Sequence, residues 1–537
     1  MKNKIFVFIF VCVLLIGVVV RFYKLGDIPN SLDWDEVSQG YNAYSILTTG
    51  KDEFGISYPL TIRSFNDYKP PIYVYLTTLP VKIFGLNPFS ARFPSAFFGS
   101  LSMLLVYGLI YEIFRKEKYA KSVALFSMLF FSISPLSIQF SRTGFDANVG
   151  VFFVMLGTWL FIRSLYKKIV WSIFLGVFFL ALSAYTTHSE KIFVSLFFVC
   201  LIFYGRKFFA NKKTIMVCLI VFFAFLNIFW FSDSETKVRS KSVLFTESTR
   251  ESFETPVYQM IFDEEHNDKL NALLHNRRFV YINKYIESYL SHFDLNFLFI
   301  HGDNARHHAP GMGVLYLFSL PFVIGGIIFV IRKKAGSSWI LFAWLLIAPI
   351  ASAFAIDPPN YQRSLIFLPT FHVFEALGWV YFLSIITKIK FPRFYIGIIV
   401  ILFSVNVFYY LHQYFLHTNS DYGKYWQYGY KETINFINTN IDTKKRIFFA
   451  SDIEQGYMFY LFYNNYDPEK YLSENGSNRI SAPCYSINNA YFGQCRDLVS
   501  KGDIYITSKG EASSDFKRIK KIEYPNNETA VEIFERL

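Results

Sequence analysis

About eleven apolar segments, each near the length that crosses a lipid bilayer, constrain this chain more than any other feature. A spanning helix needs roughly 20 mostly apolar residues. The chain of 537 residues is 53% hydrophobic and contains 63 Phe, which is too apolar for a soluble protein of this size. The sequence therefore predicts a multi-pass α-helical membrane protein. The segments are residues 5–22, 93–114, 122–141, 147–162, 169–187, 191–205, 214–231, 311–331, 337–356, 364–387 and 394–411.

Basic residues mark alternate loops between these segments, as at Arg115-Lys116, Lys167-Lys168 and Arg332-Lys333. Because loops rich in Lys and Arg stay in the cytoplasm, we expect the N-terminus inside and the C-terminus outside. Residues 71–84 are also apolar but too short to span, so we predict a helix lying in the membrane interface. The net charge of +12 comes largely from the basic loops. The soluble segments contain no basic stripe with interleaved aromatics, so the sequence does not indicate a nucleic-acid partner.

This topology places three long segments outside the cytoplasm: residues 23–92, 232–310 and 412–537. In the first, apolar residues recur at helical spacing from Val37 to Leu47, and Gly50 is suited to end that helix. The second is polar and mixed in charge, with a helical pattern near 278–291.

The third external segment has the pattern of a separate domain. Hydropathy falls after residue 411, and the roughly 120 residues that follow are enough to fold alone. We therefore predict a transmembrane domain over residues 1–411 and a small α/β domain over 412–537. Cys484 and Cys495 lie in this external segment, where an oxidising compartment favours a disulfide between them. The expected elements are helices at 431–438 and 454–463 and strands at 446–450, 503–508 and 530–534.

Three carboxylates follow the first apolar segment, at Asp33, Asp35 and Glu36. One interpretation is structural, because an acid followed three residues later by glutamate is typical of a capping box that serves a helix start. That interpretation accounts for Asp33 and Glu36 but not for Asp35. Asp35 would lie in the first helical turn, where the helix dipole favours a negative charge. A carboxylate of this kind at the membrane surface can act as a general base.

The short second external turn carries Arg142 and Asp146. Residues of these types at a membrane edge are usually a surface pair or interfacial anchors. The turn is too short to move far, however, so we expect both side chains to face the first external segment. Lys69, Arg63 and Arg92 add positive charge on the same side. Ionisable groups gathered at one side of a helical bundle indicate a functional site.

A third polar group, His301, Asp303, His307 and His308, lies within eight residues just before residue 311. These side chains could bind a metal, hydrogen-bond a phosphate or cap a helix, and their spacing matches no standard metal motif. We therefore expect no cofactor, with a divalent metal at His301, Asp303 and His307 as the alternative. Arg363, which enters the tenth apolar segment, completes the polar residues of this face.

Three of these features together resemble one enzyme family. They are Asp35-Glu36 directly after the first segment, the Lys69-Pro70-Pro71 turn and the Arg142/Asp146 pair. The family is the polyprenol-phosphate-dependent C-type glycosyltransferases, which include protein O-mannosyltransferases and the lipid A aminoarabinose transferase. The similarity covers roughly residues 5–411, and Trp34–Leu60 and Ser64–Tyr75 are especially similar to the bacterial branch. The resemblance implies the C-type glycosyltransferase fold.

The resemblance also implies roles for individual residues. Asp35 matches the catalytic aspartate with Glu36 as its acidic companion, Lys69 matches the lysine before the double proline, and Asp146 matches the second-loop acid. The aminoarabinose transferase has a glutamate directly before that lysine, where this chain has Tyr68, with Asp67 one position earlier. We therefore assign Asp67, Tyr68 and Asp33 to acceptor or sugar binding. We assign Lys69, Arg142, Arg63, His307, His308 and Arg363 to the donor phosphate.

The implied reaction transfers a sugar from a polyprenyl-phosphate carrier to an acceptor hydroxyl on the outer face of the cytoplasmic membrane, with inversion. The acceptor could be a protein, a glycolipid or a wall polymer. A polysaccharide polymerase or ligase is the nearest alternative, because it would face the same problem of topology. A transporter is the alternative from another class, but the charges lie in external loops and no inverted repeat is visible. A non-catalytic scaffold would not need Asp35, Lys69 and Asp146 at these places.

Overall fold

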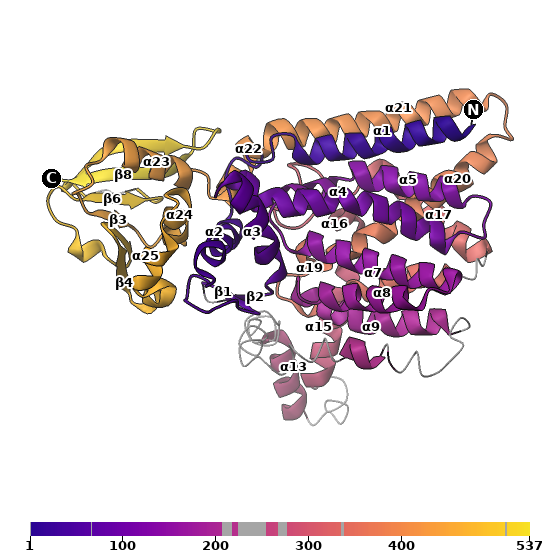
Figure 1. Ribbon diagram of the computed structural model, residues 1–537, viewed down its shortest axis with the longest axis horizontal. Coiled ribbons are helices and arrows are strands. Elements are labelled where there is room, and N and C mark those ends of the chain that lie inside the picture. Colours follow the sequence, from indigo (N-terminus) through magenta and orange to yellow (C-terminus); the bar gives the residue numbers. More distant parts are fainter. Residues whose placement is uncertain are drawn as a thin grey trace. The chain divides into compact units, whose positions relative to one another are not determined.

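The computed structural model describes residues 2–65, 67–206, 217, 219–223, 254–266, 277–333, 338–510 and 513–537. Its internal contacts divide the chain into two compact units, coloured along the sequence in Figure 1. The first unit comprises Met1–Gly17, Leu101–Ser137 and Ala147–Val407. The second comprises Val18–Ser100, Ile138–Asp146 and Phe408–Leu537. Since the second unit contains both the first external segment and the C-terminal residues, the domain boundary at residue 412 stays a prediction.

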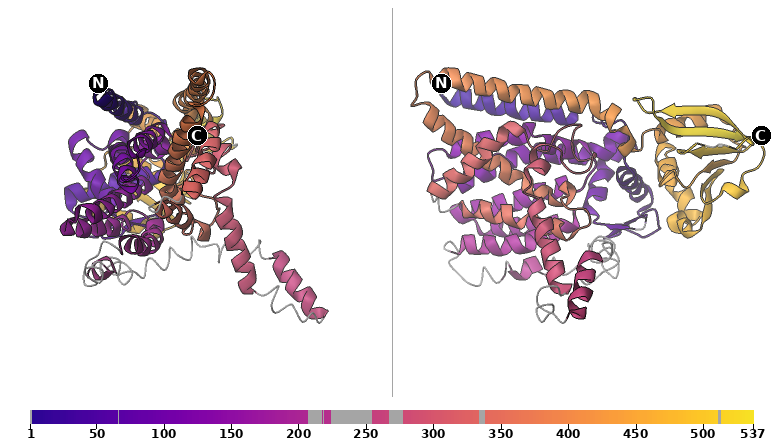
Figure 2. Two further views of the ribbon diagram at one scale, coloured as in Figure 1. Left: turned by 90° about the vertical axis from the view of Figure 1, so that its right-hand side faces the viewer. Right: turned by 180° about the vertical axis from the view of Figure 1, so that it is seen from behind.

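Long apolar helices make up the first unit and run along one another in the views of Figures 1 and 2. Within the described residues, six helices are long and apolar enough to cross a membrane, or seven if a bent pair counts as one span. The count of eleven spans and the orientation stay predictions, and the segment 214–231 lies mostly outside the described residues. The apolar helices, including the shorter ones that this count leaves out, are α1 (Lys2–Phe22), α4 (Pro88–Ile113), α5 (Ala120–Ile133), α6 (Pro135–Arg142), α7 (Ala147–Lys167), α8 (Val170–Ser183), α9 (His188–Gly205), α17 (Leu320–Lys333), α18 (Trp339–Ile347), α19 (Tyr361–Ser364), α20 (Leu368–Ile386) and α21 (Pro392–His412).

The bent pair is α5 and α6, which meet at an angle of 55°. Pro135 lacks a backbone N–H and cannot continue the helix, so backbone groups are left without helical partners at the break. Leu136 N donates to Val314 O at 3.2 Å, and the Tyr316 hydroxyl donates to Ile133 O at 2.6 Å. A neighbouring chain segment thus satisfies the break, as an apolar environment requires. Helix α17 begins at Leu320 and not at 311 as predicted, because Val314 and Tyr316 contact the break and Leu317–Ser319 form a 3-10 helix.

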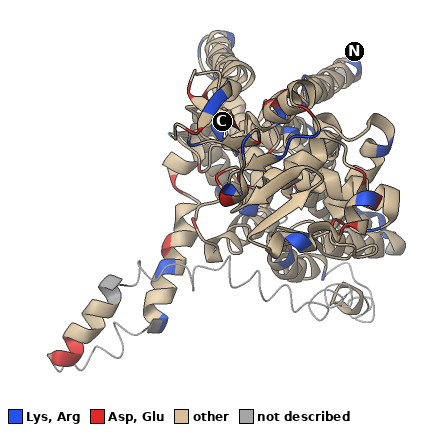
Figure 3. Cartoon of the chain, turned by 90° about the vertical axis from the view of Figure 1, so that its left-hand side faces the viewer, with Lys and Arg blue, Asp and Glu red and all other residues tan. Residues whose placement is uncertain are grey.

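Three further helices of the first unit belong to the second external segment. They are α13 (Glu254–Glu265), α15 (Arg277–Ser291) and α16 (Leu295–Phe299). Helix α15 coincides with the helical pattern predicted near 278–291. Helix α13 ends with Asp263, Glu264 and Glu265, and α15 contains Arg278 and Lys284, so these helices carry the mixed charge that the sequence indicates. Acidic residues are red and basic residues blue in Figure 3.

The second unit begins with the end of α1 and then forms α2 (Trp34–Thr49). The left-handed Gly50, with φ of 73°, ends α2 as predicted. An antiparallel hairpin follows, made of β1 (Ile62–Ser64) and β2 (Asp67–Lys69). Helix α3 (Ile72–Phe84) confirms the short helix predicted over 71–84, and its interfacial position stays a prediction.

The C-terminal residues fold into a six-stranded mixed sheet with strand order β4-β5-β3-β6-β8-β7. Strand β3 pairs in parallel with β5 and β6, and the outer pairs are antiparallel. All five elements predicted here are confirmed, while β4, β5, β7 and α25 have no counterpart in the prediction. The elements are α22 (Thr418–Asp421), α23 (Tyr430–Asn440), β3 (Ile447–Phe449), α24 (Gly456–Tyr463), α25 (Pro468–Ser473), β4 (Cys484–Ile487), β5 (Ala490–Gly493), β6 (Ile504–Thr507), β7 (Phe516–Glu523) and β8 (Thr529–Arg536).

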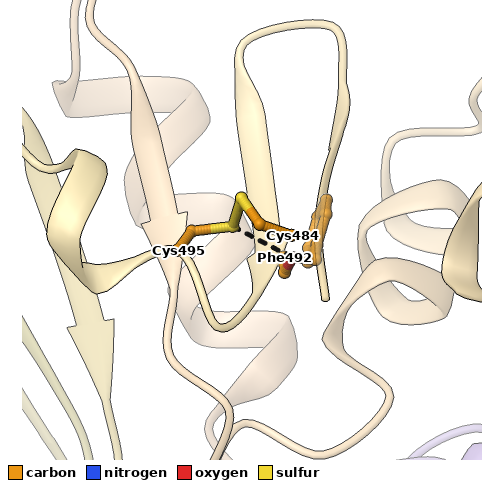
Figure 4. The surroundings of a disulfide bond; sticks show 3 residues. All are labelled: Cys484, Phe492 and Cys495. Carbon is orange, nitrogen blue, oxygen red and sulfur yellow. Dashed lines mark hydrogen bonds between the residues drawn. A yellow bond between two sulfur atoms is a disulfide. The ribbon is translucent and has the colours of Figure 1, made fainter. Parts of the chain in front are cut away.

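The two faces of this sheet are buried against different partners. Ile447 and Phe449 of β3 point into a core that also contains residues of α23 and α24. Phe448 points the other way, into a smaller core that includes Cys495. Cys495 forms a disulfide with Cys484, and the bridge clips the β4–β5 hairpin with Cys495 Sγ lying 3.1 Å from Phe492 O (Figure 4).

Candidate active site

The start of α2 is a capping box. Asp33 is the N-cap residue, and its Oδ1 accepts a hydrogen bond from Glu36 N at 2.8 Å. Glu36 Oε2 in turn accepts from Asp33 N at 3.1 Å. Both residues have an exposed fraction of 0%. The capping box predicted for these two acids is therefore confirmed, and the assignment of Asp33 to sugar or acceptor binding stays a prediction.

Glu36 is also the centre of a buried ion pair with Arg92 of α4. Arg92 Nε donates to Glu36 Oε1 at 2.8 Å, and Arg92 Nη2 donates to Glu36 Oε2 at 3.0 Å. Gly144 N donates to the same Oε1 at 2.6 Å. A Cβ on Gly144 would lie 3.0 Å from Glu36 Cγ, so this close approach favours glycine. Glu36 thus fixes α2 against α4 and against the second external turn, and its charge is already matched.

Asp35 is the one carboxylate of the three with solvent access, at 27% exposure of its side chain. It forms an ion pair with Lys69, the last residue of β2, whose side chain is 10% exposed. Asp35 occupies the first turn of α2, so the helix dipole and the ammonium both favour a negative charge there. The Lys69 ammonium also lies 5.9 Å from the centre of the Phe65 ring. Asp35 and Lys69, predicted to act together, are therefore brought together.

The β1–β2 hairpin gathers further candidates around Lys69. Arg63 lies opposite Tyr68 in the strand register, and its guanidinium stacks 4.3 Å from the Phe54 ring centre. Asp67 and Tyr68 are half-buried, and Asp67 Oδ1 accepts from Tyr68 N at 2.8 Å.

Asp146, the second-loop acid, is also half-buried. It lies two residues after Gly144, which is bonded to Glu36, and it directly precedes α7. The anchored turn therefore holds Asp146 in the same unit as Asp35.

Arg142 has a different environment from the one predicted. It is fully buried, and its Nη1 donates to Val20 O at 2.8 Å and to Arg21 O at 3.1 Å. Its Nη2 donates to Lys24 O and Ile28 O, and its Nε donates to the Tyr414 hydroxyl. These bonds occupy all five donors of a guanidinium. These contacts indicate a structural role for Arg142, and its assignment to the donor phosphate stays a prediction.

The histidine-rich group belongs to the first unit. His307 Nδ1 lies 2.7 Å from Asp303 Oδ2, which also accepts from Tyr361 N at 2.9 Å. His308 Nδ1 lies 3.0 Å from Ala309 O, and burial lowers the pKa of His308. Arg363 Nη1 donates to Ile356 O at 3.0 Å.

His301 is exposed, and Asp303 is turned toward His307 and the chain at Tyr361. Among the described residues, no three His, Cys, Asp or Glu side chains are grouped to hold a metal. The structure therefore gives the alternative metal site at His301, Asp303 and His307 no support.

Comparison with known proteins finds similar sequences over part of the chain. Residues 68–230 match the family model described as dolichyl-phosphate-mannose-protein mannosyltransferase, a range that contains Lys69 and Asp146. Over 106 residues the chain is 31% identical to YkcB of Bacillus subtilis (strain 168), a provisionally named mannosyltransferase, covering 20% of this chain and 14% of that protein. These two matches agree with the resemblance to the polyprenol-phosphate-dependent C-type glycosyltransferases, and they cover residues 68–230 and 106 residues of the chain respectively.

Two solved structures share the fold of this chain. ArnT from Cupriavidus metallidurans, bound to undecaprenyl phosphate, matches with a TM-score of 0.52 and 12% identity over 97% of each chain. The archaeal oligosaccharyltransferase AglB from Archaeoglobus fulgidus, in complex with an inhibitory peptide and a dolichol-phosphate, matches with a TM-score of 0.51 and 13% identity. That match covers 86% of this chain and 64% of AglB.

The partners of two buried arginines, Arg92 and Arg142, have no signal in the sequence. Arg92 stands in an apolar helix, 56 positions from Glu36, and Tyr414 is 272 positions from Arg142. Neither belongs to a local motif, so only the folded chain shows these partnerships.

Proposed function

We propose that this protein transfers a sugar from a polyprenyl-phosphate carrier to an acceptor hydroxyl on the outer face of the cytoplasmic membrane. The observation that carries the proposal is the Asp35–Lys69 ion pair, which presents a partly exposed carboxylate beside an ammonium. Solved structures of the same fold hold undecaprenyl phosphate or dolichol-phosphate, which supports a lipid-linked donor. The curated relative YkcB is matched over only 14% of its length, so its named activity supports the sugar-transfer class alone.

In the proposed mechanism, Asp35 accepts the proton of the acceptor hydroxyl as its oxygen attacks the anomeric carbon. The bond between that carbon and the phosphate oxygen breaks, and the leaving polyprenyl phosphate takes the electron pair. A phosphate needs no general acid to leave, so one carboxylate suffices, in contrast to the two that glycoside hydrolysis requires. Attack from the face opposite the phosphate inverts the configuration.

Lys69 has two successive partners in this mechanism. In the structure it is paired with Asp35, and the developing charge on the phosphate would attract the ammonium during transfer. Arg63, on the paired strand, adds positive charge near Lys69. His307, His308 and Arg363 stay proposed phosphate partners, and Asp67 and Tyr68 stay proposed contacts of the sugar or acceptor. Asp146 stays a proposed catalytic residue.

Glu36 takes no part in the chemical step of the proposed mechanism and acts by holding other residues in place. Its four hydrogen-bond donors hold it inside the protein, where it keeps the start of α2 and the turn before α7 in register. Asp35 is the next residue in the chain. We therefore propose Glu36 as a positioning residue and Asp35 as the base.

The proposal is tested by incubating the purified protein with a panel of radiolabelled undecaprenyl-phosphate sugars and candidate acceptors. We expect the wild type to consume one donor, and Asp35→Asn to lose about 10²–10⁴ of the turnover while still binding that donor. Equal turnover by both proteins would remove Asp35 from the chemistry. Transfer of a preassembled oligosaccharide in place of a single sugar would favour the polymerase or ligase alternative.

A further inference from the structure

Glu53 is a buried carboxyl group that the proposed mechanism does not use. It follows α2 on the loop after Gly50 and has an exposed fraction of 0%. Glu53 Oε2 accepts a short hydrogen bond from Ser477 Oγ and a longer one, 3.4 Å, from the Tyr457 hydroxyl. Both partners belong to the C-terminal part of the second unit. Glu53 therefore joins the loop after α2 to the segment around α24 and α25.

The backbone makes the same connection. Ser477 N donates to Glu53 O at 2.9 Å. Gly476, with φ of 51°, packs so closely that a Cβ would lie 2.5 Å from Glu53 O. Only glycine allows both this conformation and this approach. The junction is thus a specific contact between two parts of the chain that are distant in sequence.

On its other side Glu53 is bound to α2. Asn42 Nδ2 donates to Glu53 Oε1 at 2.9 Å, and Glu53 N donates to Asn42 Oδ1 at 3.0 Å. Asn42 Nδ2 also lies 3.0 Å from Ser38 O and 3.3 Å from Ser38 Oγ. Ser38 Oγ in turn lies 2.7 Å from Ser64 Oγ. A buried polar chain thus runs from Glu53 through Asn42 and Ser38 to Ser64.

The far end of this chain lies beside the candidate active site. Ser38 is three residues after Asp35, one turn along the same helix face. Ser64 ends strand β1 and pairs with Asp67 of β2, the strand that ends at Lys69. The two members of the Asp35–Lys69 pair are therefore attached to the two elements that the chain connects.

We propose that Glu53 is a positioning residue for sugar transfer, which holds Asp35 and Lys69 in register through Asn42, Ser38 and Ser64. The inference rests on the proposed function. It adds that sugar transfer depends on the C-terminal sheet, because Ser477 and Tyr457 from that part of the chain complete the contacts of Glu53. Glu53 touches neither Asp35 nor Lys69, so its effect acts through the geometry of α2 and the hairpin.

The protonation state of Glu53 matters for this geometry. An ionised carboxylate can accept from Asn42, Ser477 and Tyr457 together, whereas a protonated one must turn one oxygen into a donor. Burial raises the pKa of Glu53 to about 7. Among the described residues, no cation is one of its hydrogen-bond partners. The titratable and charged groups that face it are Asp52, Tyr41, Tyr457, Tyr471 and Tyr485, with Arg479 over the Tyr471 ring.

The experiment measures kcat and donor KM between about pH 5.5 and 9 for the wild type and Glu53→Gln, with the donor that the wild type consumes. The amide of this variant would resemble the protonated carboxyl, because it has one acceptor oxygen and one donor group. We expect wild-type kcat to fall roughly tenfold as the pH drops through about 7, because Glu53 then takes up a proton. Glu53→Gln should show the low kcat throughout and lack that inflection, with donor KM within about twofold of the wild type.

Asp452→Asn is the matched control. Asp452 is a carboxylate of the same domain that accepts hydrogen bonds from Thr507, Ser508 and Lys509, all outside α2 and the hairpin. This variant should keep the wild-type inflection of kcat. If its kcat falls as much as that of Glu53→Gln, the fall is a general effect of destabilising the C-terminal sheet, and the inference is overturned. Wild-type kcat and inflection in Glu53→Gln would overturn it directly.

Ser64→Ala cuts the chain at its other end and decides the question if Glu53→Gln does not fold. A lowered kcat with unchanged donor KM supports the inference, and an unchanged kcat overturns it. The proposed function has its own readout, since a wild type that consumes no donor would remove both proposals at once. A wild type that consumes donor while Glu53→Gln is normal would remove only the inference.

Discussion

Glu36 and Arg92 form an ion pair of two hydrogen bonds that is closed to solvent on both sides. Arg92 completes its donors on the carbonyl oxygens of Leu25, Pro29 and Ser31. The neighbouring acid, Asp35, is paired with Lys69 and partly exposed. Two adjacent carboxylates therefore have opposite environments, and they should have opposite phenotypes.

Glu36→Gln should lower the stability of the folded protein, whereas Asp35→Asn should not. The first change leaves the buried Arg92 guanidinium without its counter-charge, which typically costs about 3–5 kcal/mol. The second removes a partly exposed ion pair and one favourable interaction with the helix dipole, which together are worth about 1 kcal/mol or less. Thermal unfolding in detergent measures both. An Asp35→Asn protein that unfolds as readily as Glu36→Gln would mean that its lost turnover does not report on chemistry.

Lys69→Met should weaken donor binding and slow turnover together. The Lys69 ammonium is paired with Asp35. A donor phosphate bound beside Asp35 would lose this ammonium as its hydrogen-bonding partner when Lys69 is replaced by Met. We expect roughly a tenfold rise in the Kd for undecaprenyl phosphate, measured by thermal shift, with a further fall in kcat. Lys69→Arg serves as the control because it keeps the charge, and it should retain most of the binding. Unchanged affinity in Lys69→Met would place the phosphate elsewhere.

Arg142→Met tests whether the buried arginine is structural. It removes donors from Val20 O, Arg21 O and Ile28 O, and each buried acceptor left without a partner costs about 1–3 kcal/mol. We therefore expect a loss of at least about 3 kcal/mol in the free energy of unfolding. The affinity of the folded protein for undecaprenyl phosphate should stay within about twofold. A large loss of affinity without loss of stability would return Arg142 to the phosphate site.

Local patterns in the sequence were sufficient where the physics is local. The capping box depends on Asp33 and Glu36, which are three residues apart. The end of α2 depends on the left-handed conformation of Gly50, which glycine adopts more readily than other residues. The family resemblance likewise depends on short motifs, such as Lys69-Pro70-Pro71. These features could be predicted because each is complete within a few residues.

The remaining features depend on partners far away in the chain. Arg142 is an isolated arginine in the sequence, and its partners are mostly backbone carbonyl oxygens, which every residue has. Glu53 lies 424 positions from Ser477. The short strands β4 and β5 are paired by the fold and clipped by the Cys484–Cys495 bridge, and their own sequences show no clear alternation. No local pattern indicates such contacts.

Removing the Cys484–Cys495 disulfide should destabilise the C-terminal sheet domain without changing the site. The bridge closes a loop with a sequence separation of 11, for which the chain-entropy account gives about 2–3 kcal/mol. We expect the double variant Cys484→Ala/Cys495→Ala to unfold at a lower denaturant concentration, with donor Kd unchanged. The wild type treated with reductant should behave like the double variant. A variant as stable as the oxidised wild type would show that β4 and β5 hold the hairpin alone.

The stability of the protein should fall as the pH rises through neutrality, because of Glu53. Burial raises its pKa from an ordinary value of 4.5 to about 7, so between these values the native state holds a proton that the unfolded chain releases. The free energy of unfolding then decreases with increasing pH across this window and levels off above it. The full change for one such group is about 3 kcal/mol. Burial raises the pKa of Asp52 as well, which adds a change of the same sign.

Glu53→Gln should flatten this pH dependence, and Asp452→Asn should leave it in place. Chemical unfolding between about pH 5 and 8 measures the slope directly. Transfer activity is expected to change in the opposite direction, since the ionised carboxylate holds Asn42, Ser477 and Tyr457 together while costing stability. If the free energy of unfolding of the wild type does not fall over this range, Glu53 ionises with little loss of stability. The activity inflection near pH 7 would then come from the titration of another group.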